Sequence, residues 1–223
     1  MIALALVTLA FEAGPAPAPA PLPDAPIRTV VYKISVQREN SSYIERFMRA
    51  DDRRAVYMDD GDVTVDVMVN AESGLGVRVT ELTRSRGYPA RFLGNVTANG
   101  SVNFADDSIS DPTRELLPYF GVRFAAQHEL DAGETWKTAV GDVTVRSTDR
   151  HLVTLEITEH FKVANAVSEV LSHGSVVYEP SMLVPISGDI VRTRTELYPE
   201  GSIQIRELIH FERVTDSFEQ APR

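Results

Sequence analysis

Alternation of apolar and polar residues with a period of two is the feature that most constrains the fold of this chain. Between residues 62 and 69, valine occupies every second position, and Asp, Thr and Met fill the positions between. The same alternation recurs in the segments 28–37, 75–79, 153–163, 191–197 and 203–211. Successive side chains of a strand point to opposite faces of a sheet, so each segment is predicted to be a strand with one apolar face. Such strands are typical of antiparallel sheets.

Turn signals connect the predicted strands. Asn99-Gly100 favours a tight hairpin, because this pair accommodates the positive φ values that such a turn requires. Pro199-Glu200-Gly201 joins the two C-terminal strands, and Gly141-Asp142 separates two short ones. Asp59-Asp60-Gly61-Asp62 lacks the spaced oxygen ligands of a calcium loop, and we expect it to form an acidic turn before the valine strand.

Helical signals are few. Asp111-Pro112 places a capping residue and a first-turn proline ahead of residues 113–117, and Pro118 ends this short helix. Residues 43–49 fit a helix or a strand, and so do residues 164–171. We therefore predict an all-β, mainly antiparallel fold, either a single curved sheet or an incomplete barrel, with one or two short helices.

The composition excludes several classes of function. The chain has 43% hydrophobic and 24% charged residues, which is ordinary for a soluble globular protein. It contains no cysteine, which excludes disulfides, thiol catalysis and zinc–thiolate sites. Its net charge is −10 and it has no block of basic residues, so nucleic acid is not an expected partner.

Three segments are predicted along the chain: a signal segment (1–13), a proline-rich spacer (14–26) and a single β domain (27–218). Residues 2–11 are apolar except for one threonine; this length fits the core of a secretory signal and is shorter than the ~20 residues that a membrane-spanning helix needs. The prolines of the spacer favour an extended conformation. The layout predicts an extracytoplasmic domain, secreted or periplasmic, without an integral membrane span. The alternative is a disordered N-terminal tail on a cytoplasmic protein.

Glu81, Glu159 and Glu207 break the alternation, because each falls on the apolar phase of its predicted strand. An unpaired carboxylate is costly to bury, so each must meet a partner, water or a cavity. One interpretation is a polar patch inside an apolar ligand cavity. The others are a bulge that shifts the strand phase, a position beyond the sheet edge, or a structural pair with an arginine.

Three further residues complete the candidate ligand-cavity set. Arg28 and His151 begin apolar phases of their own strands, and the single tryptophan, Trp136, follows a Gly-Glu-Thr turn and also fits a core anchor. No two of the five histidines have the spacing of a local metal pair, and no nucleophile or phosphate-loop motif occurs. No catalytic residue, metal or cofactor is therefore predicted.

A few short motifs resemble those of known proteins. They are the turn Gly133-Glu134-Thr135-Trp136, the segment Gly174 to Glu179 followed by Leu183-Val184-Pro185, and the long closing hairpin. Together with the signal and spacer, they resemble bacterial secreted proteins of uncharacterised families, some similar to the LolA/LppX-like lipoprotein-carrier superfamily. The resemblance implies an incomplete barrel that holds acyl chains against a concave apolar face. It transfers no functional residue, and the lipid-anchor cysteine of anchored members is missing.

Three functions are compatible with these features. The first is a non-catalytic extracytoplasmic domain that binds a hydrophobic small molecule or lipid on the concave face of a curved sheet. The second is a structural or protein-interaction module of the cell envelope, with an envelope protein as partner. The third is a carboxylate-based hydrolase, which requires two of the three glutamate carboxyls to lie about 5–9 Å apart.

Overall fold

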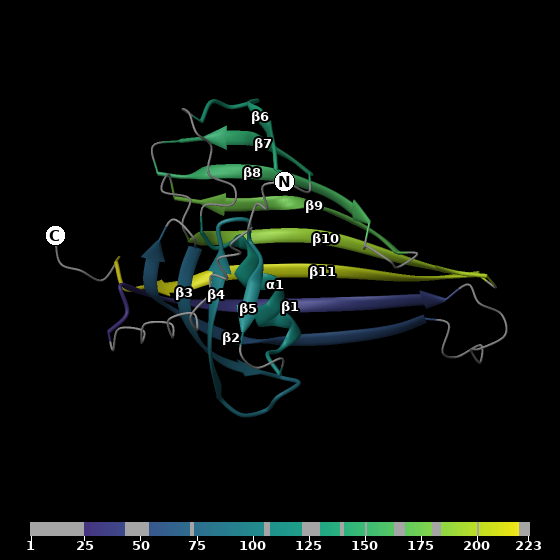
Figure 1. Ribbon diagram of the computed structural model, residues 1–223, viewed down its shortest axis with the longest axis horizontal. Coiled ribbons are helices and arrows are strands. Elements are labelled where there is room, and N and C mark those ends of the chain that lie inside the picture. Colours follow the sequence, from purple (N-terminus) through teal and green to yellow (C-terminus); the bar gives the residue numbers. More distant parts are fainter. Residues whose placement is uncertain are drawn as a thin grey trace, which may run out of the picture.

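The described part of the chain forms one antiparallel sheet of eleven strands that is not closed into a barrel (Figure 1). The computed structural model describes residues 25–42, 54–71, 74–104, 108–121, 130–138, 141–149, 151–162, 168–179, 184–199 and 201–218. One short α-helix, continued by a 3-10 turn, accompanies the sheet in these ranges. The predicted all-β, antiparallel fold is confirmed. None of the helical residues in these ranges belongs to a helix long and apolar enough to cross a bilayer.

The two terminal strands meet in the middle of the sheet. The elements are β1 (Arg28–Ser42), β2 (Arg54–Ala71), β3 (Gly74–Thr83), β4 (Ala90–Thr97), β5 (Val102–Phe104), α1 (Asp111–Leu116), η2 (Leu117–Tyr119), β6 (Thr135–Lys137), β7 (Gly141–Thr148), β8 (Val153–Lys162), β9 (Ser168–Tyr178), β10 (Pro185–Tyr198) and β11 (Gly201–Asp216). Their order is β5-β4-β3-β2-β1-β11-β10-β9-β8-β7-β6. The chain therefore runs from the centre to one edge, crosses to the other edge through the segment containing α1, and returns. Both edge strands have three residues, and short edges limit pairing with other chains.

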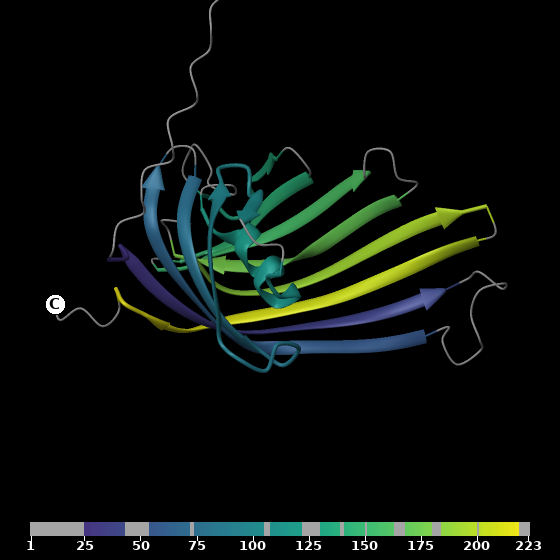
Figure 2. The same ribbon diagram turned by 60° about the horizontal axis from the view of Figure 1, so that its bottom comes forward.

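The core lies between one face of the sheet and the α1–η2 segment. On β1, the alternate residues from Val30 to Val36 are at most 3% exposed, and Ile34 faces Phe211 of β11. Figure 2 shows the sheet curling around α1, so this core face is the concave one. The rings of Tyr32 and Phe120 meet edge to face with their centroids 5.6 Å apart. The residues that α1, η2 and the next position bury against the sheet are Leu116, Leu117, Tyr119 and Phe120.

The expected acidic turn at residues 59–62 is wrong, because these residues lie within β2. Asp60 pairs with Arg84 (2.7 Å) and Asp59 accepts a hydrogen bond from the backbone N–H of Ser85 (2.9 Å), so these two carboxylates have partners just past the end of β3. Glycine is required at position 61 by the close approach of β3, since a Cβ atom there would lie 2.2 Å from the carbonyl oxygen of Leu82. Gly61 therefore permits strand pairing at this point.

Other predicted turns and helices were closer to the structure. The Asn99-Gly100 hairpin is confirmed, with φ of 82° at the glycine. Gly141-Asp142 opens β7 and is not the turn itself. Helix α1 is confirmed, with Ser110 as its N-cap in place of Asp111. Residues 43–49 and 164–167 lie outside the described residues, and 168–171 belong to β9.

We predict that the packing of Gly188 against Phe211 leaves no room for a methyl group. A Cβ atom at Gly188 would lie 2.3 Å from Cζ of the Phe211 ring across β10 and β11. Gly188→Ala is therefore expected to lower the free energy of unfolding by about 1–3 kcal/mol, measured by urea denaturation. Combined with Phe211→Leu, which removes the obstructing ring atoms, it should cost less than the two single changes summed. Strict additivity would contradict this account.

Candidate functional site

All three glutamates that break the alternation lie buried on the concave face. Glu81 is 0%, Glu159 5% and Glu207 7% exposed. The pairing register is regular at each of them, so neither a bulge nor a position beyond the sheet edge explains their phase. What surrounds each carboxylate therefore decides what it does.

Glu81 anchors the start of α1 to β3. Its carboxylate accepts hydrogen bonds from the Ser110 hydroxyl (2.7 Å), the Ser110 backbone N–H (3.1 Å) and the Thr113 hydroxyl. Arg86 Nε lies 3.0 Å from its Oε1 atom. Ser110 is also the N-cap of the helix, and a negative charge is favourable beside the free N–H groups of a helix start. The buried charge of Glu81 is thus fully engaged in positioning α1.

Glu207 lies in a network that holds α1 against the other half of the sheet. Its Oε1 atom accepts from Arg38 Nε (2.9 Å) and Nη2 (2.7 Å), and its Oε2 atom lies 3.6 Å from Arg192 Nη1. Helix α1 supplies the two outer partners: Asp111 bonds to Arg38 (3.0 Å) and Glu115 bonds to Arg192. We call these five residues the α1 charge network.

The α1 charge network contains three carboxylates and two guanidinium groups, and Glu115 shows the effect of that imbalance. Burial is the largest influence on the pKa of Glu115 and raises it. Arg192 lowers this pKa in part, whereas the nearby Glu207 and Asp111 raise it further, and the net pKa lies above the ordinary 4.5 of a glutamate. For Arg192, ion pairing outweighs burial, so its pKa is raised. Helix α1 is therefore held by the ion pairs of Asp111 and Glu115 with arginines, although the three carboxylates of the network repel one another.

Glu159 belongs to the same cross-strand row as Glu207 but is remote from it. The register aligns Glu207, Arg192, Ser172 and Glu159 on β11, β10, β9 and β8. Three strand spacings put the backbones of the two glutamates about 14 Å apart. Glu81 is on the opposite side of α1, on β3. The three carboxylates therefore do not form the closely spaced acid–base pair that a glycosidase-like site needs.

Arg28 belongs to a second buried charge cluster, at the other end of β1. It bonds to Asp216 (3.1 Å) and Glu179 (3.0 Å), and Arg213 also pairs with Glu179 (2.7 Å) and Asp216 (2.9 Å). Burial alone would raise the pKa of Asp216, but hydrogen bonds from Arg28 and the Phe218 backbone outweigh it and the pKa is lowered. The cluster joins the first strand to the last one.

The remaining two candidates lie apart from the glutamates. His151 is exposed in the turn between β7 and β8, where its backbone N–H donates to Asp149 (2.7 Å). Trp136 is partly buried on the edge strand β6 and packs against the core. The structure thus links Glu81 and Glu207 to α1 from opposite sides, and places Arg28, His151 and Trp136 elsewhere.

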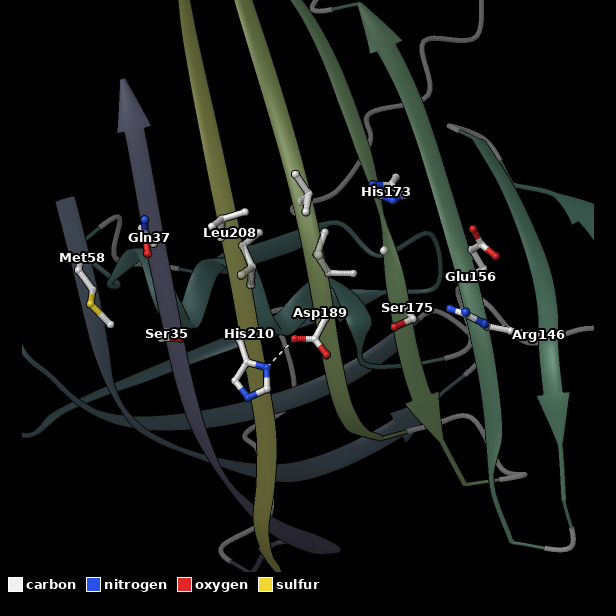
Figure 3. Close-up of a pocket in the computed structure, with 14 residues that line it drawn as sticks. Ser35, Gln37, Met58, Arg146, Glu156, His173, Ser175, Asp189, Leu208 and His210 are labelled. Atoms are coloured by element: carbon white, nitrogen blue, oxygen red, sulfur yellow. Dashed lines mark hydrogen bonds and ion pairs between the residues drawn. The ribbon is translucent and has the colours of Figure 1, made fainter. Parts of the chain in front are cut away.

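Sequence reasoning missed a groove of about 360 Å³ on the outer face of the sheet (Figure 3). Its apolar lining includes Met58, Leu208 and Val191, and His210 Nδ1 lies 2.7 Å from an Asp189 oxygen at its margin. The register pairs Val191 with Leu208 on the outer face, whereas Ile190 and Arg192 of β10 share the concave face. Only that register could have revealed the groove. No group of three or more His, Asp or Glu in the described part of the chain is arranged to hold a metal ion.

Comparison with known proteins finds no family model that matches this chain and no similar sequence among curated proteins. Structure alone therefore defines its class. The described residues form an open, eleven-stranded antiparallel sheet, and a short helical segment held by buried charges packs against the centre of its concave apolar face.

We predict that Glu115 makes stability fall as pH rises. The raised pKa means that the folded state binds this proton more tightly than the unfolded chain, so the folded state loses stability as pH rises from 4.5 through the raised pKa. Glu115→Gln lacks this loss, and its stability relative to the wild type should improve between about pH 4 and about pH 7 in urea titrations. Glu212→Gln, an exposed change on β11, serves as the control. A difference that does not vary with pH, or that falls, would contradict the assignment.

Proposed function

We propose that this chain is a non-catalytic extracytoplasmic domain that binds a hydrophobic or lipidic ligand on the concave face of its sheet, beneath the α1–η2 segment. The observation that carries the proposal is the nature of the cover. The concave face carries a wide apolar surface, including Val65, Val77 and Leu155, and among the described residues a nine-residue helical segment, and not a second sheet, packs against its central strands β1, β2 and β11. Ligand sites are mostly apolar and concave, with a few polar groups at defined positions.

The cover is suited to displacement. Helices as short as the six residues of α1 are not stable by themselves in water, so α1 depends on its contacts with the sheet. At its start these contacts are the hydrogen bonds to Glu81, and along its length they are the pairs of Asp111 and Glu115 with arginines. Such polar contacts re-form with water when the helix lifts. In this structure, with the helix in place, the buried apolar side chains Leu116, Leu117 and Phe120 occupy the surface that a ligand would cover.

The resemblance to the LolA/LppX-like superfamily supports the same function. In those carriers an incomplete barrel holds acyl chains on its concave apolar face, and this chain also has an open sheet with a concave apolar face. Under this proposal Glu81 and Glu207 hold the cover through its polar contacts, and the ligand binds the apolar surface between them. The predicted signal and spacer would deliver such a domain outside the cytoplasm.

A second function, as a protein-interaction module of the cell envelope, is favoured by one specific observation. In the outer-face groove, on the face opposite the cover, Met58 is about half exposed, and Gln37 of β1 separates it from Leu208. An envelope protein that binds there would be expected to protect His173 and His210 from chemical modification.

The ligand proposal predicts that purified protein carries extractable lipid and rebinds a fluorescent fatty acid after delipidation. Mass spectrometry of an organic extract identifies the bound species, and cis-parinaric acid fluorescence reports rebinding. Arg192→Met weakens the α1 charge network and should accelerate uptake of cis-parinaric acid several-fold. Arg206→Met, on the same hairpin but on the outer face, is the matched control and should leave the rate unchanged.

Two results would contradict the proposal. One is an extract without lipid from a protein that also fails to bind cis-parinaric acid. The other is an equal change of uptake rate in both arginine variants, because that would separate ligand entry from the α1 cover.

A further inference from the structure

The α1–η2 segment has acidic groups on the helix and apolar groups directly after them, as an anionic amphiphile has a charged head and an apolar tail. Asp111 and Glu115 of α1 bond to Arg38 (3.0 Å) and Arg192 of the sheet. The apolar side chains that follow along the chain are buried against the concave face. They are Leu116, Leu117, Tyr119 and Phe120. The acidic part of the segment thus lies on guanidinium groups, and the apolar part lies on hydrocarbon.

The two arginines that hold α1 flank a single carboxylate on the sheet. The register places Arg38 of β1 and Arg192 of β10 on either side of Glu207 of β11. Glu207 accepts from Arg38 Nε at 2.9 Å and lies 3.6 Å from Arg192 Nη1. A guanidinium group has five N–H donors, so each arginine can bind a second acidic group besides Glu207. Its planar donor fork fits the oxygens of a carboxylate or a phosphate.

Displacement of α1 reverses the charge balance at these arginines. With the helix in place, the α1 charge network has three carboxylates and two guanidinium groups. Without Asp111 and Glu115, Glu207 is the one carboxylate of the network that remains. Glu159 does not replace them, because its backbone lies two strand spacings, about 10 Å, from that of Arg192. A partly buried charge that loses its partner is destabilising, so the displaced carboxylates need a negatively charged replacement.

The apolar surface begins directly beside the charged row. The next concave row toward the Arg28 end contains Val36, Ile209 and Ile190, each at most 3% exposed. From Val36 to Val30, β1 continues this buried face over six residues, or about 20 Å of strand. The hydrocarbon of a bilayer is ~30 Å thick and contains two layers of chains, so one acyl chain spans about half of it. The concave face is therefore long enough for an acyl tail whose head lies at Arg38 and Arg192.

We propose that the ligand is an amphiphile with an anionic headgroup, and that this headgroup replaces Asp111 and Glu115 on Arg38 and Arg192. The inference rests on the proposed function, because it names the class of ligand that the same concave face binds. A neutral headgroup leaves the two guanidinium groups with Glu207 alone, and a cationic one adds to the excess of positive charge. An anionic headgroup restores the balance. Carboxylate and phosphate heads share this chemistry.

Isothermal titration calorimetry of delipidated protein with four amphiphiles of equal chain length tests the proposal. The probes are laurate, dodecyl phosphate, the neutral monolaurin and the cationic dodecyltrimethylammonium, each below its micelle-forming concentration. At least one of the two anions should bind about tenfold or more tightly than monolaurin, because hydrogen bonds to charged groups are stronger than those between neutral groups. The anion that binds more tightly identifies the headgroup. Dodecyltrimethylammonium should bind most weakly.

Arginine variants test whether this preference comes from the α1 charge network. Arg192→Met should reduce the ratio of the affinity for the preferred anion to that for monolaurin about tenfold. Arg38→Gln keeps an amide donor for Glu207 but loses the charge, and it should lower the same ratio. Arg206→Met, on the exposed outer face of β11, is the matched control and should leave the ratio unchanged. This equilibrium ratio reports the headgroup, whereas the uptake rate of cis-parinaric acid reports the cover.

Three outcomes would overturn the headgroup proposal: monolaurin that binds as tightly as both anions, a wild-type affinity ratio in both Arg192→Met and Arg38→Gln, or an equal loss of the ratio in Arg206→Met. Each of them leaves the proposed function intact, because the amphiphiles still bind. Failure of the proposed function gives a different result. Protein that carries no lipid and binds neither cis-parinaric acid nor any of the four amphiphiles overturns the carrier, and the headgroup site with it.

Discussion

Burial of a carboxylate in an apolar face is the constraint on which the rest of this structure depends. A charge taken out of water must be paired, and removing its partner is strongly destabilising. Glu81 meets this requirement with the start of α1, and Glu207 meets it with Arg38 and Arg192, which in turn hold Asp111 and Glu115 of α1. The charges that look out of place in the strands are therefore what fixes the cover to the sheet.

The strand order explains why the helical segment lies across the concave face. Because β1 and β11 pair in the centre, the chain must pass from the β5 edge to the β6 edge, and its helical part lies across the concave face. At the Arg28 end of β1, the cluster of Arg28, Arg213, Glu179 and Asp216 ties the terminal strands together. One end of the sheet is thus closed by buried ion pairs.

The parts of this arrangement that could be predicted are those that depend on neighbours in sequence. Period-two alternation identified the strands and placed Glu81, Glu159 and Glu207 on their apolar phases, and the Asn-Gly pair identified one hairpin. What could not be predicted depends on register between distant strands. Glu207 meets Arg192 because β10 pairs with β11 in this register. The sequence pattern predicts the phase of Val191 and Thr193 as the apolar, core-facing side of β10, whereas the structure places it on the outer face. The sequence around Gly61 indicates a turn, because the contact that requires glycine there, the Leu82 carbonyl, lies on another strand.

The most direct test of the central claim, that buried glutamates hold the cover, is hydrogen exchange of the α1 amides in Glu81→Leu. This change leaves the Ser110 and Thr113 donors without their acceptor. The account predicts that the amides of Arg114 to Leu117 lose protection, while those at the β1–β11 pairing keep theirs. Glu212→Leu, on the exposed side of β11, should change neither. Unchanged protection in α1, or an equal loss throughout the sheet, would contradict the claim.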